Sequence, residues 1–392
     1  MRSPTTYAHR MLALIAAIAA SGCSDTPTRI VQPRAANLSA VKFWDANAST
    51  RWNERAITHM SQRTLSNGQA AASRILAYLS LAQYRAARAA EAGKEGRVHP
   101  AVSVAVGAAS AVVLSWFFPA DAATFEAQFD TDLATPGWPG AKNQDATSGE
   151  SIGRAVGAAV ITLASTDNYL PGVSVGVPPV GPGFWVWNGL PIVRSLHGVR
   201  PFFMTSASQL RSPPPPAFGS TAFLAGLAEI RAISDHRTAE QLANAQRWAT
   251  GFTISSNNQE ANTLIRKYHR TEREAARILA YANAAAFDAQ IACWDAKVFY
   301  WFIRPSQADP GITVPINLPN HPSYPSGHSC ITGAVMTVLM DAFPSERGRL
   351  AAIIEEAGLS RMYGGIHYRF DIEAGQDIGR GAAALARTGS LE

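Results

Sequence analysis

The sequence predicts an all-α protein, built as a single bundle of about ten helices. Apolar residues make up 47% of its 392 residues, and alanine, the best helix former, dominates among them. Apolar positions recur at the spacing of amphipathic helices in several segments, and no segment has the apolar–polar alternation that is typical of a strand. A chain of this length can bury a sizeable core without disulfides or structural metals.

The first residues have the pattern of an export signal. Arg2 and Arg10 precede a ten-residue apolar stretch, Met11–Ala20, which is too short to span a bilayer but suits a signal peptide. Ser21-Gly22-Cys23 follows and is similar to a bacterial lipobox, in which the cysteine is lipidated and becomes the mature N-terminus. We therefore expect residues 1–23 to be a lipoprotein leader, and an ordinary signal peptide is the alternative.

The leader determines the expected location and partners. We expect an exported protein of the periplasm or cell envelope, with residues 24–37 as a tether and a helical domain over residues 38–392. Removal of Arg2 and Arg10 lowers the formal charge from +5 to +3, and no Lys/Arg run marks a nucleic-acid-binding arm. A small anion is therefore a more suitable partner than a nucleic acid. No later apolar run reaches the roughly 18 residues of a membrane helix, so we expect membrane contact only through a lipid on Cys23.

Within the domain, helical patterning that stops at proline, glycine or polar residues predicts successive helices. The predicted segments are 68–93, 101–118, 122–133, 148–165, 222–233, 239–248 and about 257–298. Thr166–Ser220 is rich in Gly, Pro and aromatic residues and includes Pro213–Pro216. A connection this long inside a compact domain is usually functional, and its aromatic residues favour a packed loop that covers the site over a free linker.

Two cysteines remain after the leader, Cys293 and Cys330. Their spacing is neither that of a metal site nor that of a disulfide framework. We expect two buried free thiols. A contact between them is the alternative, because both flank the motifs described next.

The first of three motifs that suit an oxyanion site is Lys297 and Arg304 followed by Pro305. Seven residues make about two helical turns, so both cations are expected on one face of a helix, about 10 Å apart, with the proline ending that helix. Alone, the pair also fits a solvated basic face.

The second motif is Tyr324-Pro325-Ser326-Gly327-His328, which precedes an apolar helical run over residues 330–343. The proline and the glycine predict a helix N-terminus, where free backbone N–H groups and the Ser326 hydroxyl can hold an anion. His328 would stand beside that anion, with a pKa suited to proton transfer. The alternative is a serine cap, a turn glycine and a surface histidine.

The third motif is Ser360-Arg361, then Gly364-Gly365, His367 and Asp371. The glycine pair is expected to turn the chain into a last helix, on which His367 and Asp371, four residues apart, share one face. A carboxylate in that position fixes the imidazole tautomer and raises the basicity of the outward nitrogen. A helical His–Asp pair on its own is usually only a surface contact.

In this order and with these gaps, the motifs resemble the full signature of the superfamily that joins type 2 phosphatidic acid phosphatases to vanadium-dependent haloperoxidases. Trp294–Lys297, His321–His328 and the Pro-rich stretch are similar to its soluble bacterial haloperoxidase-like branch. The resemblance implies a helical fold of that type, with the core of the oxyanion site in residues 287–392. Vanadate or phosphate would be bound by Lys297, Arg304, Ser326, Gly327 and Arg361.

For a haloperoxidase, the resemblance implies that His367 is the axial vanadium ligand and that Asp371 orients it. His328 would shuttle protons while hydrogen peroxide oxidises a halide. Trp294 stands where an aromatic residue accompanies chloroperoxidases, whereas His321 stands where bromoperoxidases tend to have histidine. The halide is therefore left open, with bromide or iodide favoured.

For an acid phosphatase, the same residues would act on a phosphate ester without a cofactor. His367 would attack phosphorus to form a phosphohistidine, and His328 would protonate the leaving alkoxide. A third hypothesis is an envelope protein that only binds phosphate, but binding alone does not need both histidines and Asp371. The long helical N-terminal half, the lack of membrane helices and Trp294 favour the haloperoxidase-like enzyme, with vanadate as its cofactor.

Overall fold

The computed structural model of the chain describes residues 47–65, 68–93, 99–134, 144–169, 177–187, 196 and 198–392. The expected leader with Cys23 and the expected tether lie outside these residues. The lipid anchor and the envelope location therefore stay predictions.

Helices dominate the described residues, as predicted. The α-helices are α2 (Ala48–Ser61), α3 (Gln69–Ala92), α4 (Val102–Phe117), α5 (Ala122–Ala134), α6 (Ala146–Ser165), α7 (Thr221–Asp235), α8 (Ala239–Ala249), α9 (Thr253–Lys267), α10 (Glu272–Tyr300), α11 (Pro305–Ala308), α12 (Gly327–Ala342), α13 (Arg347–Tyr363) and α14 (Arg369–Thr388). Two short 3-10 helices are η3 (Pro119–Asp121) and η4 (Pro344–Glu346). The described strands, β1 (His99–Pro100) and β2 (Gln144–Asp145), form one small parallel pair.

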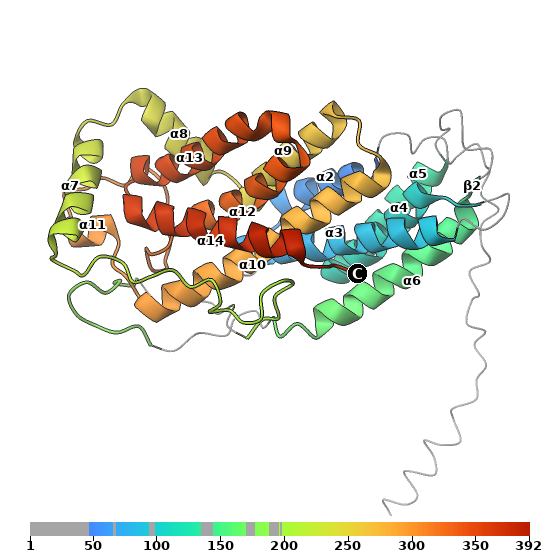
Figure 1. The fold of residues 1–392 in the computed structure, drawn as a ribbon, viewed down its shortest axis with the longest axis horizontal. Helices are drawn as coiled ribbons and strands as arrows, with labels where there is room; N and C mark the ends of the chain where they lie inside the picture. Colours follow the sequence, from blue (N-terminus) through green and yellow to red (C-terminus); the bar gives the residue numbers. More distant parts are fainter. Residues whose placement is uncertain are drawn as a thin grey trace, which may run out of the picture. The chain divides into compact units, whose positions relative to one another are not determined.

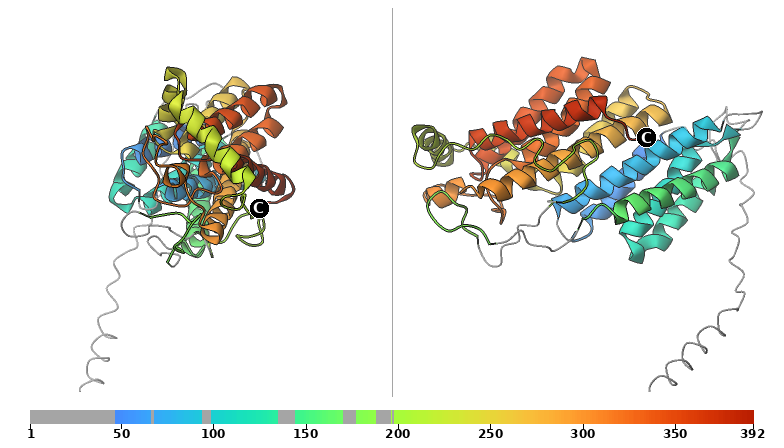
Figure 2. Two further views of the ribbon diagram at one scale, coloured as in Figure 1. Left: turned by 90° about the vertical axis from the view of Figure 1, so that its left-hand side faces the viewer. Right: turned by 60° about the horizontal axis from the view of Figure 1, so that its bottom comes forward.

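The central helix of the bundle is α10 (Figure 1). It packs against α3 on one side and against α12 and α14 on another. Buried residues are spread around its whole circumference, which is typical of a helix enclosed by others. At one end of the bundle α3, α4 and α6 pack together, and α7, α8 and α11 lie at the other end. In the left view of Figure 2, α7 crosses that second end.

Glycines allow α14 to approach α12 closely. A Cβ added to Gly375 would lie 2.6 Å from the carbonyl oxygen of Ser326, and one added to Gly379 would lie 2.6 Å from the backbone of Ala334 and Cys330. Only glycine permits such a backbone approach. The first turns of the two helices are therefore held side by side, which matters because both carry residues of the predicted motifs.

The expectation of one helix over residues 257–298 is wrong, because the structure has α9 and α10 there. The chain leaves α9 at Tyr268, and His269 adopts a positive φ of 48°. Thr271 then begins α10 with a capping box, in which Glu274 accepts a hydrogen bond from the Thr271 N–H at 2.9 Å. The helices α2, α11 and α13 were also not predicted. The predicted helices outside residues 257–298 are present, with ends that differ by a few residues.

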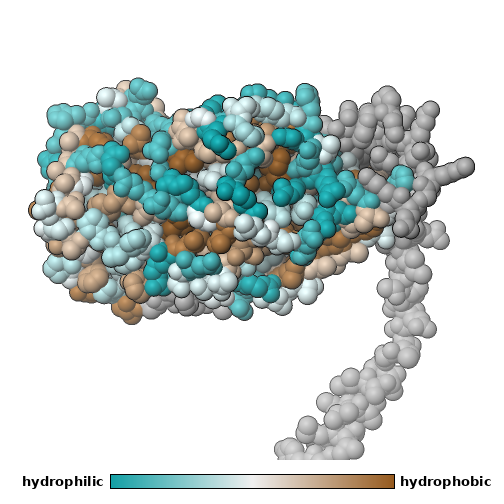
Figure 3. Space-filling view, in the orientation of Figure 1, coloured by the Kyte–Doolittle hydropathy of each residue, from teal (hydrophilic) through white to brown (hydrophobic). Residues whose placement is uncertain are grey.

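No helix in the described ranges combines the length and the apolar character needed to cross a bilayer. The most apolar predicted segment is α4, and it is buried against other helices along most of its length. On the face drawn in Figure 3, hydrophobic residues are interspersed with hydrophilic ones.

The described parts of the long Gly- and Pro-rich stretch pack against the end of α10. The Trp185 ring stacks on Trp301 with centroids 6.3 Å apart, and its backbone N–H donates to the Trp301 carbonyl at 2.7 Å. Further along, the Pro213 carbonyl accepts a hydrogen bond from the Tyr324 hydroxyl at 2.6 Å. As predicted, these parts form a packed loop, and they flank the residues of the first two motifs.

Candidate oxyanion site

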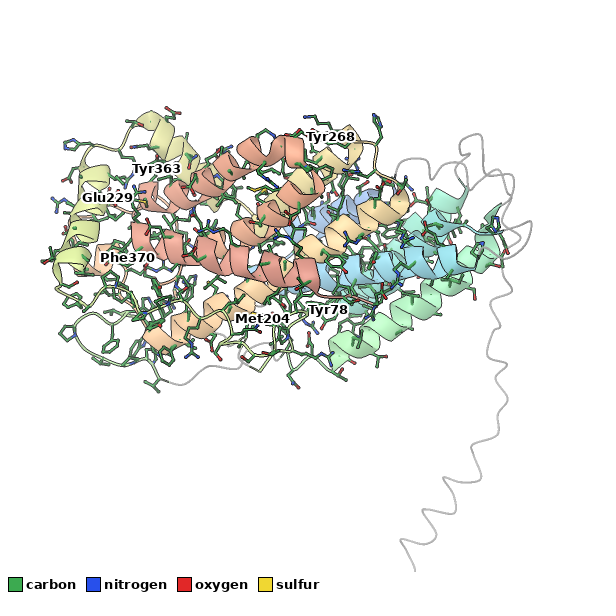
Figure 4. The ribbon with its side chains drawn as sticks, viewed as in Figure 1. Tyr78, Met204, Glu229, Tyr268, Tyr363 and Phe370 are labelled. Atoms are coloured by element: carbon green, nitrogen blue, oxygen red, sulfur yellow. The ribbon has the colours of Figure 1, made fainter. Side chains whose placement is uncertain are left out.

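The three motifs meet at the end of the bundle where α13 ends and α14 begins. Figure 4 marks this end with Tyr363, the last residue of α13, and Phe370, in the first turn of α14. Lys297 comes from the last turn of α10, and the Ser326–His328 segment forms the start of α12. Arg304 and His367, which are 63 positions apart in the sequence, are thus brought into contact here.

Lys297 and Arg304 do not lie on one helical face, contrary to the sequence prediction. α10 ends before Trp301, which adopts a left-handed conformation with φ 50°. The chain turns there, and Arg304 becomes the residue preceding α11. Pro305 is the first residue of that short helix, a position that suits proline because its missing N–H would have no helical partner. The proline therefore begins a helix and does not end one.

Lys297 holds the loop that leads into α12. Its Nζ donates to the carbonyls of Pro322 at 2.8 Å, Ser323 at 2.9 Å and Pro325 at 2.6 Å, and its side chain is buried. An ammonium group has three protons, so all of them are engaged by the loop. Lys297 therefore supplies positive charge to the site without a spare hydrogen bond in this conformation.

Arg304 joins this loop to the third motif. Its Nε and Nη2 donate to the His321 carbonyl and ring nitrogen, each at 3.0 Å. Its Nη1 donates to the Ile366 carbonyl at 2.7 Å and lies 3.3 Å from His367 Nε2. The guanidinium is completely buried, so it fixes both histidines while adding a second charge.

Asp371 and His367 are in contact, although they do not share a helical face as predicted. His367 precedes α14, whose N-cap is Tyr368, and Asp371 lies in its first turn. The Asp371 Oδ2 atom lies 2.8 Å from His367 Nδ1 and also accepts hydrogen bonds from Ser323 Oγ at 2.5 Å and Tyr368 N at 3.1 Å. The carboxylate therefore caps the helix and orients the imidazole at the same time.

These contacts determine the tautomer of His367. A carboxylate at Nδ1 requires a proton on that nitrogen, and a guanidinium donor at Nε2 requires a lone pair there. Burial and the nearby Arg304 and Lys297 hold the pKa of His367 well below its ordinary value. The neutral ring thus keeps an unprotonated Nε2, the form that a nucleophile or a metal ligand needs.

The start of α12 has free hydrogen-bond donors beside open space. The helix N-terminus is present as predicted, and Ser326 is its N-cap, as in the alternative interpretation. Its Oγ accepts from Ser329 N at 3.4 Å and Ser329 Oγ at 3.1 Å, which leaves its own hydroxyl proton for another acceptor. Among the described residues, the N–H groups of Gly327 and His328 have no protein acceptor. A Cβ added at Gly327 would meet nothing within 4 Å. Free donors beside open space at a helix N-terminus suit an anion.

His328 and Arg361 both contact the backbone of α8. His328 Nε2 lies 2.9 Å from the Trp248 carbonyl oxygen, and Arg361 Nη2 donates to the Ala245 carbonyl at 2.9 Å. Arg361 Nε donates to the hydroxyl of Ser360 at 2.9 Å. Within the described part of the chain, neither His328 Nδ1 nor Arg361 Nη1 has a hydrogen bond, so both can interact with a guest.

The site concentrates buried positive charge. Burial lowers the pKa of Lys297 to about 8 and those of Arg304 and Arg361 to about 10. None of the three cations has a described carboxylate within 4.0 Å, and Asp371 is the nearby acid that offsets Lys297 and Arg304 electrostatically. Burial also raises the pKa of Asp371 to about 6. It lowers that of His328 to about 3, well below the near-neutral value expected from the sequence for proton transfer. Such an excess of desolvated positive charge favours an anionic guest.

The two predicted pocket-tuning residues are also neighbours. The rings of Trp294 and His321 make an edge-to-face contact with centroids 5.0 Å apart. Burial and the adjacent cations keep the pKa of His321 well below its ordinary value. Behind them, Cys293 and Cys330 are buried free thiols, as expected, and their sulfurs interact with each other.

Sequence reasoning missed some of the residues that orient the site. Ser323 lies within the quoted His321–His328 segment, but no role was assigned to it. The carbonyls of Ala245 and Trp248 carry no side-chain signature, so no motif could have indicated them.

Comparison with known proteins agrees with this arrangement. The PAP2 superfamily model matches residues 276–390. The non-specific acid phosphatase of Providencia stuartii is 29% identical over 180 residues, which are 44% of this chain and 71% of that protein. A bacterial vanadium-dependent iodoperoxidase structure superposes with a TM-score of 0.73 at 21% identity and covers 88% of this chain and 97% of that one. An apo bacterial vanadium-dependent chloroperoxidase gives 0.69 at 15% identity, covering 86% and 97%.

The superfamily match contains every residue of the predicted oxyanion site, and the likeness to the haloperoxidase structures extends over the N-terminal helices as well. Residues 276–390 therefore match the PAP2 superfamily, and the chain has the helical fold of the vanadium-dependent haloperoxidases.

Proposed function

We propose that this enzyme is a vanadium-dependent haloperoxidase, which uses hydrogen peroxide to oxidise a halide. The observation that carries the proposal is the extent of the likeness: haloperoxidase structures match 85–88% of the chain, whereas the acid phosphatase relative matches 44%. The N-terminal helices α2–α6 are thus accounted for by the haloperoxidase fold.

The residues at the site fit vanadate, a tetrahedral oxyanion like phosphate. Arg361 Nη1, the Ser326 hydroxyl and the N–H groups of Gly327 and His328 would donate to its oxygens, and Lys297 and Arg304 would balance its charge. The unprotonated Nε2 of His367 would be the ligand to the metal. When bound, vanadate supplies the activation of peroxide towards halide. No group of three or more His, Cys, Asp or Glu side chains in the described ranges would hold a metal ion by itself.

The protein's own groups would move the protons. His328 Nδ1 is free and its Nε2 is fixed by the Trp248 carbonyl, so the ring can exchange a proton with a guest at one defined atom. Asp371 would keep His367 in its Nδ1-protonated form throughout. The Trp294–His321 pair would border the halide and influence which halide is accepted.

An acid phosphatase is the second candidate, because the relative with the higher sequence identity, 29%, is named as one. In that reaction the negative charge of the bound phosphate ester would favour uptake of a proton from water at His328 Nδ1. The His367 Nε2 lone pair would form a bond to phosphorus while the bond to the ester oxygen breaks, and His328 Nδ1 would give its proton to the leaving alkoxide. Water would then cleave the phosphohistidine and release phosphate. The same tautomer of His367 serves both reactions.

The test compares two activities of one purified protein. We expect peroxide-dependent bromination or iodination after loading with orthovanadate, and its loss in His367→Ala. The matched control is His236→Ala, an exposed histidine at the end of α7. Hydrolysis of an aryl phosphate without any halide oxidation at any vanadate concentration would exclude the haloperoxidase and establish the phosphatase.

A further inference from the structure

The last turns of α8 touch two site residues through backbone oxygens only. The Trp248 carbonyl contacts His328 Nε2 at 2.9 Å, and the Ala245 carbonyl accepts from Arg361 Nη2 at 2.9 Å. Trp248 lies in the last turn of α8, where carbonyls have no intrahelical donor, and both carbonyls lie towards the negative end of the helix dipole. They therefore suit an imidazole N–H and a guanidinium, and the position of α8 determines how both groups are aimed.

The attachment of α8 is mostly polar. Ala245 is its only buried residue, and residues of α8 and α13 line a surface groove of about 960 Å³. Little apolar area is therefore available to fix the helix. Polar side chains that bridge the groove must therefore hold α8 in place.

Those side chains converge on one carboxylate, that of Glu356 on α13. Its Oε1 accepts from the Trp248 indole N–H at 2.9 Å and from Asn244 Nδ2 at 3.2 Å, and it forms an ion pair with Arg247. All three partners belong to the last two turns of α8. Glu356 is half-buried, so its hydrogen bonds are partly shielded from water.

We propose that Glu356 is a positioning residue of the oxyanion site: it fastens the end of α8 so that the carbonyls of Trp248 and Ala245 orient His328 and Arg361. This proposal rests on the proposed function only in that the site binds a tetrahedral oxyanion. It assigns to Glu356 no contact with substrate.

The contacts of Glu356 with α8 affect the position of His328 directly. His328 is surrounded by positive or ionisable groups on other elements, namely Arg361 on α13, Lys297 on α10, Arg304 before α11, and the His321 and His367 rings. The Trp248 carbonyl is the acceptor that faces this histidine. If α8 moved away, the ring would lose its only described hydrogen bond and Arg361 would lose one of two.

The test uses Glu356→Ala in the full chain, which removes the oxygen that accepts from Trp248 and Asn244, with Glu355→Ala as the matched control. Glu355 is the adjacent residue on the same helix, and its carboxylate accepts a hydrogen bond from Gln376 of α14. We expect Glu356→Ala to weaken binding of inorganic phosphate and orthovanadate and to lower kcat, each by about tenfold, as is usual for a residue that orients a catalytic group. The melting temperature should match that of the control, and the His328 imidazole NMR signals should shift only in Glu356→Ala.

Equal anion affinity and equal kcat in the two variants would overturn the proposal. If Glu356→Ala does not fold, Trp248→Phe removes only the indole N–H, and a smaller loss of affinity with the same His328 shift is expected. An unchanged affinity in Trp248→Phe would again overturn the proposal. Anion affinity is measured without turnover. A missing haloperoxidase activity would therefore refute the proposed function and leave this inference standing.

Discussion

At the scale of single residues, the contacts of His367 decide what the site can do. Asp371 and Arg304 hold opposite edges of its ring, one as acceptor and one as donor. Because both contacts select the same neutral tautomer, the ring needs no proton transfer before it attacks phosphorus or ligates a metal.

We predict that Asp371→Asn lowers kcat by about 10- to 100-fold, the usual effect of losing a group that orients a histidine. The amide is neutral and can place an N–H towards the ring, so the Nδ1-protonated tautomer loses its preference. Steady-state kinetics of the vanadate-loaded protein measure the effect. Asp377→Asn is the control, since Asp377 lies on the exposed face of the same helix and pairs with Arg380; equal kcat in the two variants would contradict the role of Asp371.

We also predict that His328 makes the folded state less stable in acid. Burial lowers its pKa to about 3, whereas an unfolded histidine titrates near 6.5. Below pH 6.5 the unfolded state therefore binds the extra proton, and the free energy of unfolding falls as the pH falls towards 3. Between pH 7.5 and pH 5 this histidine should account for up to about 2 kcal/mol of that loss.

Urea denaturation at the two pH values tests this, with His328→Gln as the variant. Glutamine keeps an N–H for the Trp248 carbonyl but does not titrate. The variant should lose less stability on acidification than the wild type, and an identical loss would show that His328 is protonated in the folded state.

At the scale of elements, the close packing of α12 and α14 holds the anion donors next to the Asp371–His367 pair. Gly379→Ala would place a methyl group 2.6 Å from the backbone of α12. We expect a loss of about 1–3 kcal/mol in the free energy of unfolding, as for other overpacked sites, together with reduced anion binding. Gly348→Ala on α13 is the control, because its Cβ would meet nothing within 4 Å and alanine favours a helix. Calorimetric melting of both variants measures the difference, and equal melting temperatures would contradict the packing argument.

Helix types and most helix positions could be predicted from the sequence, because apolar periodicity and proline or glycine stops are local signals. The break between α9 and α10 was missed although Thr271 and Glu274 stand at capping-box spacing. The prediction that Lys297 and Arg304 share one helical face failed for a different reason. It assumed that α10 continues, and the left-handed turn at Trp301 has no local signal, because only glycine or asparagine usually marks such a conformation.

The predicted site residues lie together in the structure even where their predicted geometry was wrong. Lys297 and Arg304 meet the other motifs through loops, and Asp371 reaches His367 through the first turn of α14. Motif spacing records which residues a fold brings together, but not the backbone path between them. The contacts of the α8 carbonyls could not be predicted from the sequence, because any residue type can supply a backbone carbonyl.

For the whole molecule, the buried cations make folding and anion binding depend on each other. Lys297, Arg304 and Arg361 are desolvated near one acid, Asp371. An oxyanion that binds the folded state alone offsets their repulsion and stabilises that state by mass action. We therefore predict that orthovanadate or phosphate at about a hundred times its Kd adds about 2.7 kcal/mol to the free energy of unfolding.

Differential scanning calorimetry with and without the anion measures this gain, with chloride at equal ionic strength as the control for general screening. Arg361→Gln should abolish most of the gain, because Arg361 is the cation whose Nη1 has no described partner. Arg200→Gln, a change on the loop before Pro201 with the same loss of charge, should keep it. If both variants are stabilised as strongly as the wild type, the anion binds elsewhere on the surface. The three cations would then be held by protein carbonyls alone, and neither vanadate nor a phosphate ester would be a guest of this site.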